Sequence, residues 1–175
     1  MKSILVGVAL LGTLVPVFAD ELPESKKALG KPESIICGFN SMKTTMGGII
    51  KKLGHADKQT PFSASDPVNV LMEWNKGPLN IGINTYVIEG FENNNPVWIR
   101  VQGSDPDGYC KTGSGVKLGD SFESVKKVYG NRYGVDTVEG EKYIVYQWKN
   151  FSEISFTLTP SNLVKSIYVY GDVDP

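Results

Sequence analysis

An internal duplication is the feature that most constrains how this chain can fold. When the sequence is slid against itself by 76 residues, segment 42–54 falls over segment 118–130. Large apolar residues then coincide at four positions: Met42 with Leu118, Met46 with Phe122, Ile49 with Val125, and Leu53 with Tyr129. This spacing is the apolar stripe of an amphipathic helix, and both segments end on glycine, the usual residue just past a helix C-terminus. The duplication predicts one helix in each of two repeats.

The two predicted helices differ in how well their residues suit a helix. In the second, Asp120 or Ser121 can act as the N-cap, Glu123 adds an acid to the first turn, and Lys126-Lys127 place cations near the end. The first contains Gly47-Gly48, and each glycine costs about 1 kcal/mol relative to alanine. We expect the first helix to be shorter or looser.

Alternation of apolar and polar residues follows each helical segment and predicts three strands per repeat. The predicted strands are 68–74, 79–83 and 97–101 in the first repeat, and 143–148, 154–158 and 163–170 in the second. Short turns at 76–78 and 149–150 join the first two strands of each repeat as hairpins. The predicted fold is α+β: two tandem repeats of one helix and a three- to four-stranded antiparallel meander, with both helices on one face of the sheet.

The first nineteen residues are typical of a cleavable secretory signal peptide. Lys2 precedes an uncharged run from Ile4 to Phe18, and Ala19 stands before Asp20 at the expected cleavage point. The apolar run is shorter than the roughly twenty residues that a membrane-spanning helix needs. We therefore expect an exported protein, periplasmic or secreted, with no stable membrane anchor. The predicted parts are a signal peptide at 1–19, a polar leader at 20–36, and repeats at 37–108 and 109–175.

Only two cysteines occur, and each stands near the start of a repeat. An even number of cysteines in an exported chain favours one disulfide, so Cys37 and Cys110 are expected to tie the two repeats together. The alternative is a catalytic or metal-binding thiol pair. Their wide separation and the single histidine disfavour it.

Charge and motif content disfavour several classes of function. The 18 basic residues nearly balance 19 acidic ones, whereas nucleic-acid binding normally needs a basic excess. The one histidine, His55, stands beside no nucleophile motif, so we expect no catalytic residues, no metal and no cofactor. Asp105-Pro-Asp-Gly108 resembles the start of a calcium loop, but a plain turn explains it more simply. Glycoside hydrolysis by two carboxylates that face each other across a cleft stays an alternative, although the sequence singles out no such pair.

Strand alternation also places a group of aromatic residues on the sheet face opposite the helices. If Ile99 and Ile167 point toward the helices, their neighbours point away; these neighbours are Trp98, Arg100, Tyr168 and Tyr170, joined by Tyr86 from the adjacent strand. Trp, Tyr and Arg are the usual anchors of protein-recognition surfaces. The alternative is that the aromatics only cover the sheet or pack between the repeats.

The segment 115–130 resembles a signature of small envelope domains. Val116-Lys117-Leu118-Gly119-Asp120-Ser121 forms the entry, and a helix with Val125 then ends at Tyr129-Gly130. This pattern is similar to the superfamily of the secreted beta-lactamase inhibitor protein and the small outer-membrane assembly lipoprotein. The resemblance implies two helix-plus-sheet repeats whose sheet offers a concave face to a protein partner. This chain differs from the inhibitor, which carries a disulfide in each repeat, because it has only one cysteine per repeat. It differs from the lipoprotein because it lacks a lipid-attachment cysteine.

These patterns together favour an exported, non-enzymatic protein that binds another envelope or secreted protein through the helix-free sheet face, as an inhibitor, immunity-like protein or adaptor. The alternatives are a carrier of sugar or lipid fragments, which would use the same aromatic residues, and a hydrolase with an unrecognised site. The sequence leaves the partner and the oligomeric state open.

Overall fold

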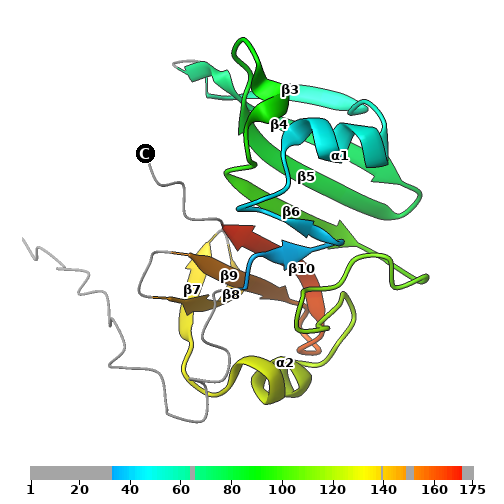
Figure 1. Ribbon diagram of the computed structural model, residues 1–175. Helices are drawn as coiled ribbons and strands as arrows, with labels where there is room; N and C mark the ends of the chain where they lie inside the picture. The colour runs from blue at the N-terminus through cyan, green and yellow to red at the C-terminus, as the bar shows by residue number, and fades with distance from the viewer. Residues whose placement is uncertain (1–32, 64–65, 139, 149–151, 171–175) are drawn as a thin grey trace, which may run out of the picture.

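An eight-stranded antiparallel sheet dominates the computed structural model, which describes residues 33–63, 66–138, 140–148 and 152–170 (Figure 1). The strands of this sheet are β3 (Lys58–Ser63), β4 (Asp66–Lys76), β5 (Leu79–Tyr86), β6 (Trp98–Gly103), β7 (Gly134–Val138), β8 (Glu141–Gln147), β9 (Glu153–Leu158) and β10 (Val164–Tyr170). Their spatial order is β3-β4-β5-β6-β10-β9-β8-β7, so the sheet has two halves that meet where β6 pairs with β10. The predicted α+β class and antiparallel sheet are confirmed.

The two strands at the sheet edges, β3 and β7, are absent from the sequence prediction. Strand β3 contains Pro61 and few apolar residues, and β7 is five residues long. An edge strand pairs on one side only, so it needs neither a regular alternation nor a complete set of backbone donors. Each half of the sheet, β3 to β6 and β7 to β10, therefore contains four strands.

The helices α1 (Met46–Leu53) and α2 (Phe122–Tyr129) have the same length and the same kind of ends. The hydroxyl of Thr45 accepts a hydrogen bond from the Gly48 amide, and the hydroxyl of Ser121 accepts one from the Ser124 amide. The expectation that the glycines shorten the first helix is wrong. A side chain at Gly47 would lie 3.1 Å from the Glu92 carbonyl oxygen, so this glycine lets the short helix η2 (Phe91–Asn93) approach α1.

Both helices contact the same face of the sheet. After α1, the Gly54 carbonyl accepts a hydrogen bond of 2.9 Å from the Trp74 indole on β4; after α2, the Gly130 carbonyl accepts one of 2.8 Å from the Tyr146 hydroxyl on β8. The side chains of one cross-strand row share this face and are buried: Trp74, Ile81, Val101, Ile167, Phe156 and Ile144. In each strand, the residues directly before and after this row point to the opposite face of the sheet, which we call the outer face.

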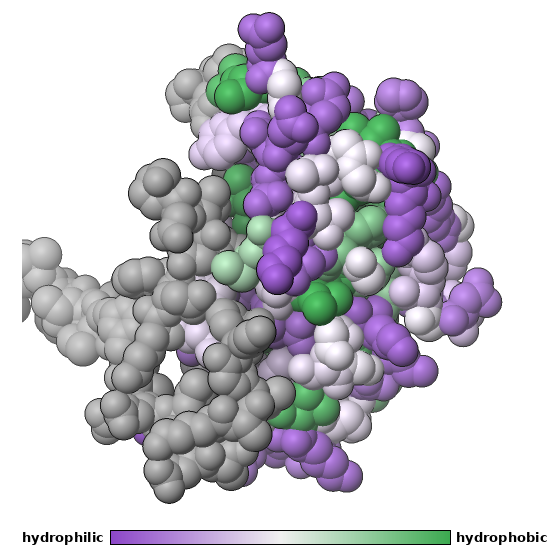
Figure 2. Space-filling model, in the orientation of Figure 1, coloured by the Kyte–Doolittle hydropathy of each residue, from purple (hydrophilic) through white to green (hydrophobic). Residues whose placement is uncertain are grey.

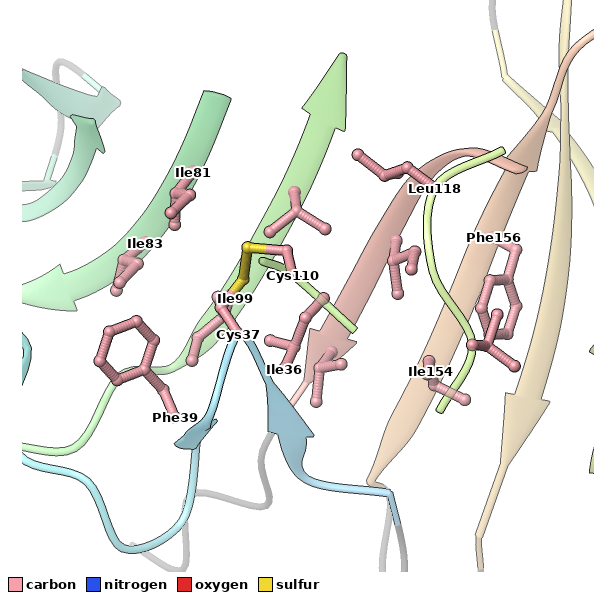
Figure 3. Packing of buried hydrophobic residues seen from close by; sticks show 14 of the residues in the cluster. Ile36, Cys37, Phe39, Ile81, Ile83, Ile99, Cys110, Leu118, Ile154 and Phe156 are labelled. Carbon is pink, nitrogen blue, oxygen red and sulfur yellow. A yellow bond between two sulfur atoms is a disulfide. The ribbon is translucent and has the colours of Figure 1, made fainter. Parts of the chain in front are cut away.

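A disulfide-linked hairpin fills the core between the two helices. Strands β1 (Ile35–Ile36) and β2 (Phe39–Asn40) are joined by a tight turn in which Cys37 and Gly38 both have positive φ. The predicted disulfide between Cys37 and Cys110 is confirmed. Figure 3 shows it above Ile99, with Ile81 and Ile83 on one side and Phe156 on the other. Both cysteines are almost fully buried, so the bridge is part of the core.

Glu33 anchors the segment that leads into this hairpin. Its buried carboxylate accepts hydrogen bonds from the Ile35 and Ser114 amides and, at 3.0 Å, from the Tyr129 hydroxyl on α2. Residues 33–36 of the expected polar leader therefore lie against the core. The expected signal peptide and the rest of the leader lie outside the described residues. Among the residues that are described, no helix is long and apolar enough to cross a membrane.

Candidate protein-recognition face

Four of the five predicted recognition residues are neighbours at the middle of the outer face. Arg100 pairs with Tyr168 across β6 and β10, and Trp98 pairs with Tyr170 in the same ladder. We call these four residues the outer patch. Because β6 and β10 belong to different halves, each half of the sheet contributes two of its side chains. The alternation along these strands predicted that the four side chains share one face of the sheet, and the strand register agrees.

The aromatic residues of the outer patch pack on one another. The ring centroids of Trp98 and Tyr168 are 5.0 Å apart, with the ring planes tilted by 31°. Trp98 is only 7% exposed, whereas Tyr168 and Tyr170 are half-buried. Trp98 therefore packs against Tyr168, and the two tyrosines are more exposed than the tryptophan.

The fifth residue, Tyr86, lies at the rim. It is the last residue of β5, where it pairs with Asn69 of β4, and it is 42% exposed. The ladder between β5 and β6 ends at Asn84 and Trp98, so Tyr86 extends past the patch. It shares the outer face with the other four residues but does not join their ring contacts.

A charged pair borders the patch on the side of β4. The Arg100 guanidinium lies 3.4 Å from the Glu73 carboxylate, and the Lys58 ammonium lies 3.8 Å from the same carboxylate. Glu73 is 16% exposed and Lys58 67% exposed, so the pair with Arg100 is the more shielded. The Arg100 Nε is buried and has no hydrogen-bond acceptor among the described residues.

On the other side of the patch, Glu153 is a functional candidate that the sequence prediction missed. It pairs with Tyr170 across β10 and β9, and burial raises the pKa of its carboxyl from the ordinary value. The carboxylate makes no hydrogen bond or ion pair with another described side chain. The predicted strand began at Ile154, one residue too late; extending its alternation with Ser155 and Thr157 would have placed Glu153 on the outer face.

The electrostatic setting of Tyr168 relates these charges to the patch. Burial is the main cause that raises the pKa of the Tyr168 hydroxyl; the Glu153 carboxylate and Tyr170 raise it further, and Arg100 lowers it. Tyr168 therefore lies between a carboxylate on β9 and a guanidinium on β6. This arrangement can hold a charged or hydrogen-bonding group of a ligand against an aromatic surface.

Two other candidate residues from the sequence, Asp105 and His55, lie in loops. The Asp105 carboxylate accepts hydrogen bonds from the Tyr109 and Cys110 amides, at 3.0 and 2.6 Å, so it closes a turn. His55 is exposed in the connection after α1. Across the described ranges, no three Asp, Glu, His or Cys side chains gather as a metal site would require. Asn150, which begins an Asn-Phe-Ser glycosylation sequence, and the acidic residues Asp172 and Asp174 lie outside those ranges.

The side that carries α1 offers no competing apolar surface in view. Figure 2 shows the molecule in the orientation of Figure 1, with hydrophilic residues surrounding small, separate groups of hydrophobic ones over its coloured part. The exposed Ile88 and Tyr109 lie in connecting loops. The outer patch, on the face away from this view, brings aromatic and charged side chains together on two paired strands.

The comparisons with known proteins concern the fold. The sequence matches no protein-family model and no curated protein. Its structure is similar to that of a DUF4309 family protein (YjgB) from Bacillus subtilis, with a TM-score of 0.48 and 20% identity over 74% of this chain and 79% of that chain. It is also similar to an extracellular protein containing a SCP domain from Bacillus anthracis, with a TM-score of 0.48 and 10% identity over 75% of this chain and 45% of that chain.

A third similar structure is a proposed beta-lactamase inhibitor protein from Streptococcus mutans. Its TM-score is 0.29, and 13% of residues are identical over 85% of this chain and 98% of that chain. At these TM-scores and identities, the likenesses give no residue of this chain a role.

Proposed function

We propose that this chain is an exported, non-catalytic protein that binds another protein through the outer patch. The observation that carries this proposal is the meeting of Trp98, Arg100, Tyr168 and Tyr170 on two paired strands of the helix-free face. Tyr, Trp and Arg bury much area at a small cost in side-chain entropy, which is why they dominate the energetics of protein interfaces. Inhibitor, immunity-like and adaptor proteins all act by such binding.

The proposal includes a duplicated origin for the two halves. Equivalent positions 76 residues apart carry the same roles: Thr45 and Ser121 are N-caps, and Gly54 and Gly130 end the helices with φ of 85° and 88°. Trp74 and Tyr146 bond the carbonyls of those two glycines. Since β6 and β10 are the last strands of the two halves, the patch forms only where both repeats meet.

Export is supported by the N-terminal sequence and by the disulfide. Disulfides persist mainly in oxidising compartments such as the periplasm and the extracellular medium. The bond between Cys37 and Cys110 occupies both thiols of the chain, so neither is available as a nucleophile. A binding role therefore agrees with the chemistry of these residues better than thiol catalysis does.

Affinity capture with matched variants tests the proposal. The protein is immobilised and exposed to envelope and secreted extracts, beside a Tyr168→Ala/Tyr170→Ala variant and a control, Ile88→Ala/Tyr109→Ala. The control removes exposed apolar groups from loops. One stoichiometric partner should bind the wild type and the control, and should bind the patch variant at least about tenfold more weakly. Equal binding by the patch variant, or no partner for the wild type, would overturn the assignment.

A further inference from the structure

Two carboxylates flank the outer patch, and they differ in the number of cations that lie within ion-pair distance. Glu73 has two cations within ion-pair distance, Arg100 and Lys58. Glu153 stands on the opposite side of the patch, and none of the described cations pairs with it. Its raised pKa reflects the loss of water without a compensating partner. Among the described residues, Glu153 is therefore the carboxylate beside the patch that has no cation paired with it, and the cation in excess near Glu73 is the exposed Lys58.

Aromatic rings border this carboxylate. Tyr170 pairs with Glu153 in the ladder between β10 and β9, and Tyr168 lies on the same face one diagonal step away. The influence of Glu153 on the pKa of Tyr168 places the two groups within electrostatic range. A carboxylate beside tyrosine rings attracts an ammonium or guanidinium group. Such a group can form an ion pair with the carboxylate and a cation–π contact with the rings.

An anionic partner group fits this place less well. The Arg100 guanidinium, the cation of the patch, is already paired with Glu73. An anion that reached it would also approach Glu153, with which no described cation pairs. Like charges brought together at a desolvated interface lower affinity and exclude wrong partners. Charge complementarity at the outer patch therefore favours a positively charged group of the partner over a negatively charged one.

We propose that the outer patch receives a lysine or arginine side chain of the protein partner, with its positive charge against Glu153 and its aliphatic stem along Tyr168 and Tyr170. The proposal rests on the proposed function and names the chemistry of the partner. Glu153 would then be a specificity-determining residue, and the partly desolvated carboxylate is set to pair with an incoming cation without a large further loss of water.

A peptide-display selection on the immobilised protein tests this chemistry directly. Random peptides are selected on the wild type, and competition with the Tyr168→Ala/Tyr170→Ala variant removes those that bind elsewhere. We expect one position of the selected peptides to be enriched in lysine or arginine. Such a peptide should bind Glu153→Gln at least about tenfold more weakly, whereas Glu92→Gln, an exposed glutamate of η2, should bind it as the wild type does.

A double-mutant cycle separates a direct contact from a general charge effect. The selected lysine or arginine is replaced by norleucine, which keeps an aliphatic stem and removes the charge. This change should weaken binding to the wild type by a similar factor and leave binding to Glu153→Gln unchanged. Patch-specific peptides without a cation, or equal binding to Glu153→Gln, would overturn the inference and leave the proposed function standing. A selection that yields no patch-specific peptide would overturn the inference, and the capture experiment would then decide the proposed function.

Discussion

The Arg100 guanidinium lies 3.4 Å from the Glu73 carboxylate, although β5 separates the strands that carry these two residues. Gly82 of β5 stands between them in the cross-strand row. A Cβ atom at position 82 would lie 3.3 Å from Arg100 Nη2 and 3.3 Å from Leu71 Cδ1. The absent side chain therefore allows the arginine to lie across β5 and reach Glu73.

Gly82→Ala should push the Arg100 side chain away from Glu73. We expect a loss of about 1 kcal/mol in the free energy of unfolding, measured by urea denaturation, because the added methyl group overpacks a buried position. In the Gly82→Ala background, Glu73→Gln should then cost less than it does in the wild type. Gly134→Ala is the matched control: its Cβ would meet only ordinary contacts, at 3.9 Å from Val145. Equal effects of the two alanines would contradict this account.

Glu153→Gln should stabilise the protein at neutral pH. Burial raises the pKa of this carboxyl in the folded state, so the folded protein holds the proton more tightly than the unfolded chain does. Below the unfolded pKa both states are protonated and the variant gains nothing; the wild type loses stability relative to it as the pH rises through the folded pKa. Thermal unfolding at pH 4 and pH 7 measures this: the advantage in Tm should be present at pH 7 and shrink at pH 4. An advantage that does not depend on pH would contradict the expected cause.

Loss of the disulfide should strongly destabilise the fold. The bridge closes 73 residues of chain separation, for which the chain-entropy model gives about 4 kcal/mol of stabilisation. Urea denaturation of Cys37→Ala/Cys110→Ala should show a loss of that order. Because both cysteines are buried, dithiothreitol should reduce the native wild type only as fast as the protein opens. Rapid reduction without denaturant would show that the bridge is more accessible than its burial implies.

Tyr146→Phe should remove one hydrogen bond and little else. The hydroxyl donates at 2.8 Å to the Gly130 carbonyl at the end of α2, so its loss should cost about 1 kcal/mol in the free energy of unfolding. Tyr143→Phe, on the outer face of the same strand, provides the control, since its hydroxyl makes no hydrogen bond within the described chain. Urea denaturation of both variants should separate them; a Tyr143 effect as large as that of Tyr146 would argue against this role.

Much of the sheet follows from local patterns in the chain. Alternation placed Trp98 and Arg100 on one face of a strand and Tyr168 and Tyr170 on one face of another, because successive side chains of a strand point to opposite sides. The apolar stripe with terminal Gly54 and Gly130 located both helices, although each begins four residues later than the stripe does. The count and positions of cysteines predicted the disulfide.

What the sequence by itself determined is therefore which residues share a strand face, which segments form helices, and which cysteines pair. Only the tertiary structure decided that β6 lies beside β10, that Arg100 crosses Gly82 to reach Glu73, and that Glu153 lies beside Tyr170 with no ion pair to a described residue. The tertiary structure also decided the edge strands β3 and β7, because they form by pairing with an inner strand and their own composition indicates a strand only weakly. The physical reason is range: alternation and helical stripes arise from backbone geometry over a few residues, whereas strand order and charge balance depend on contacts between distant parts of the chain.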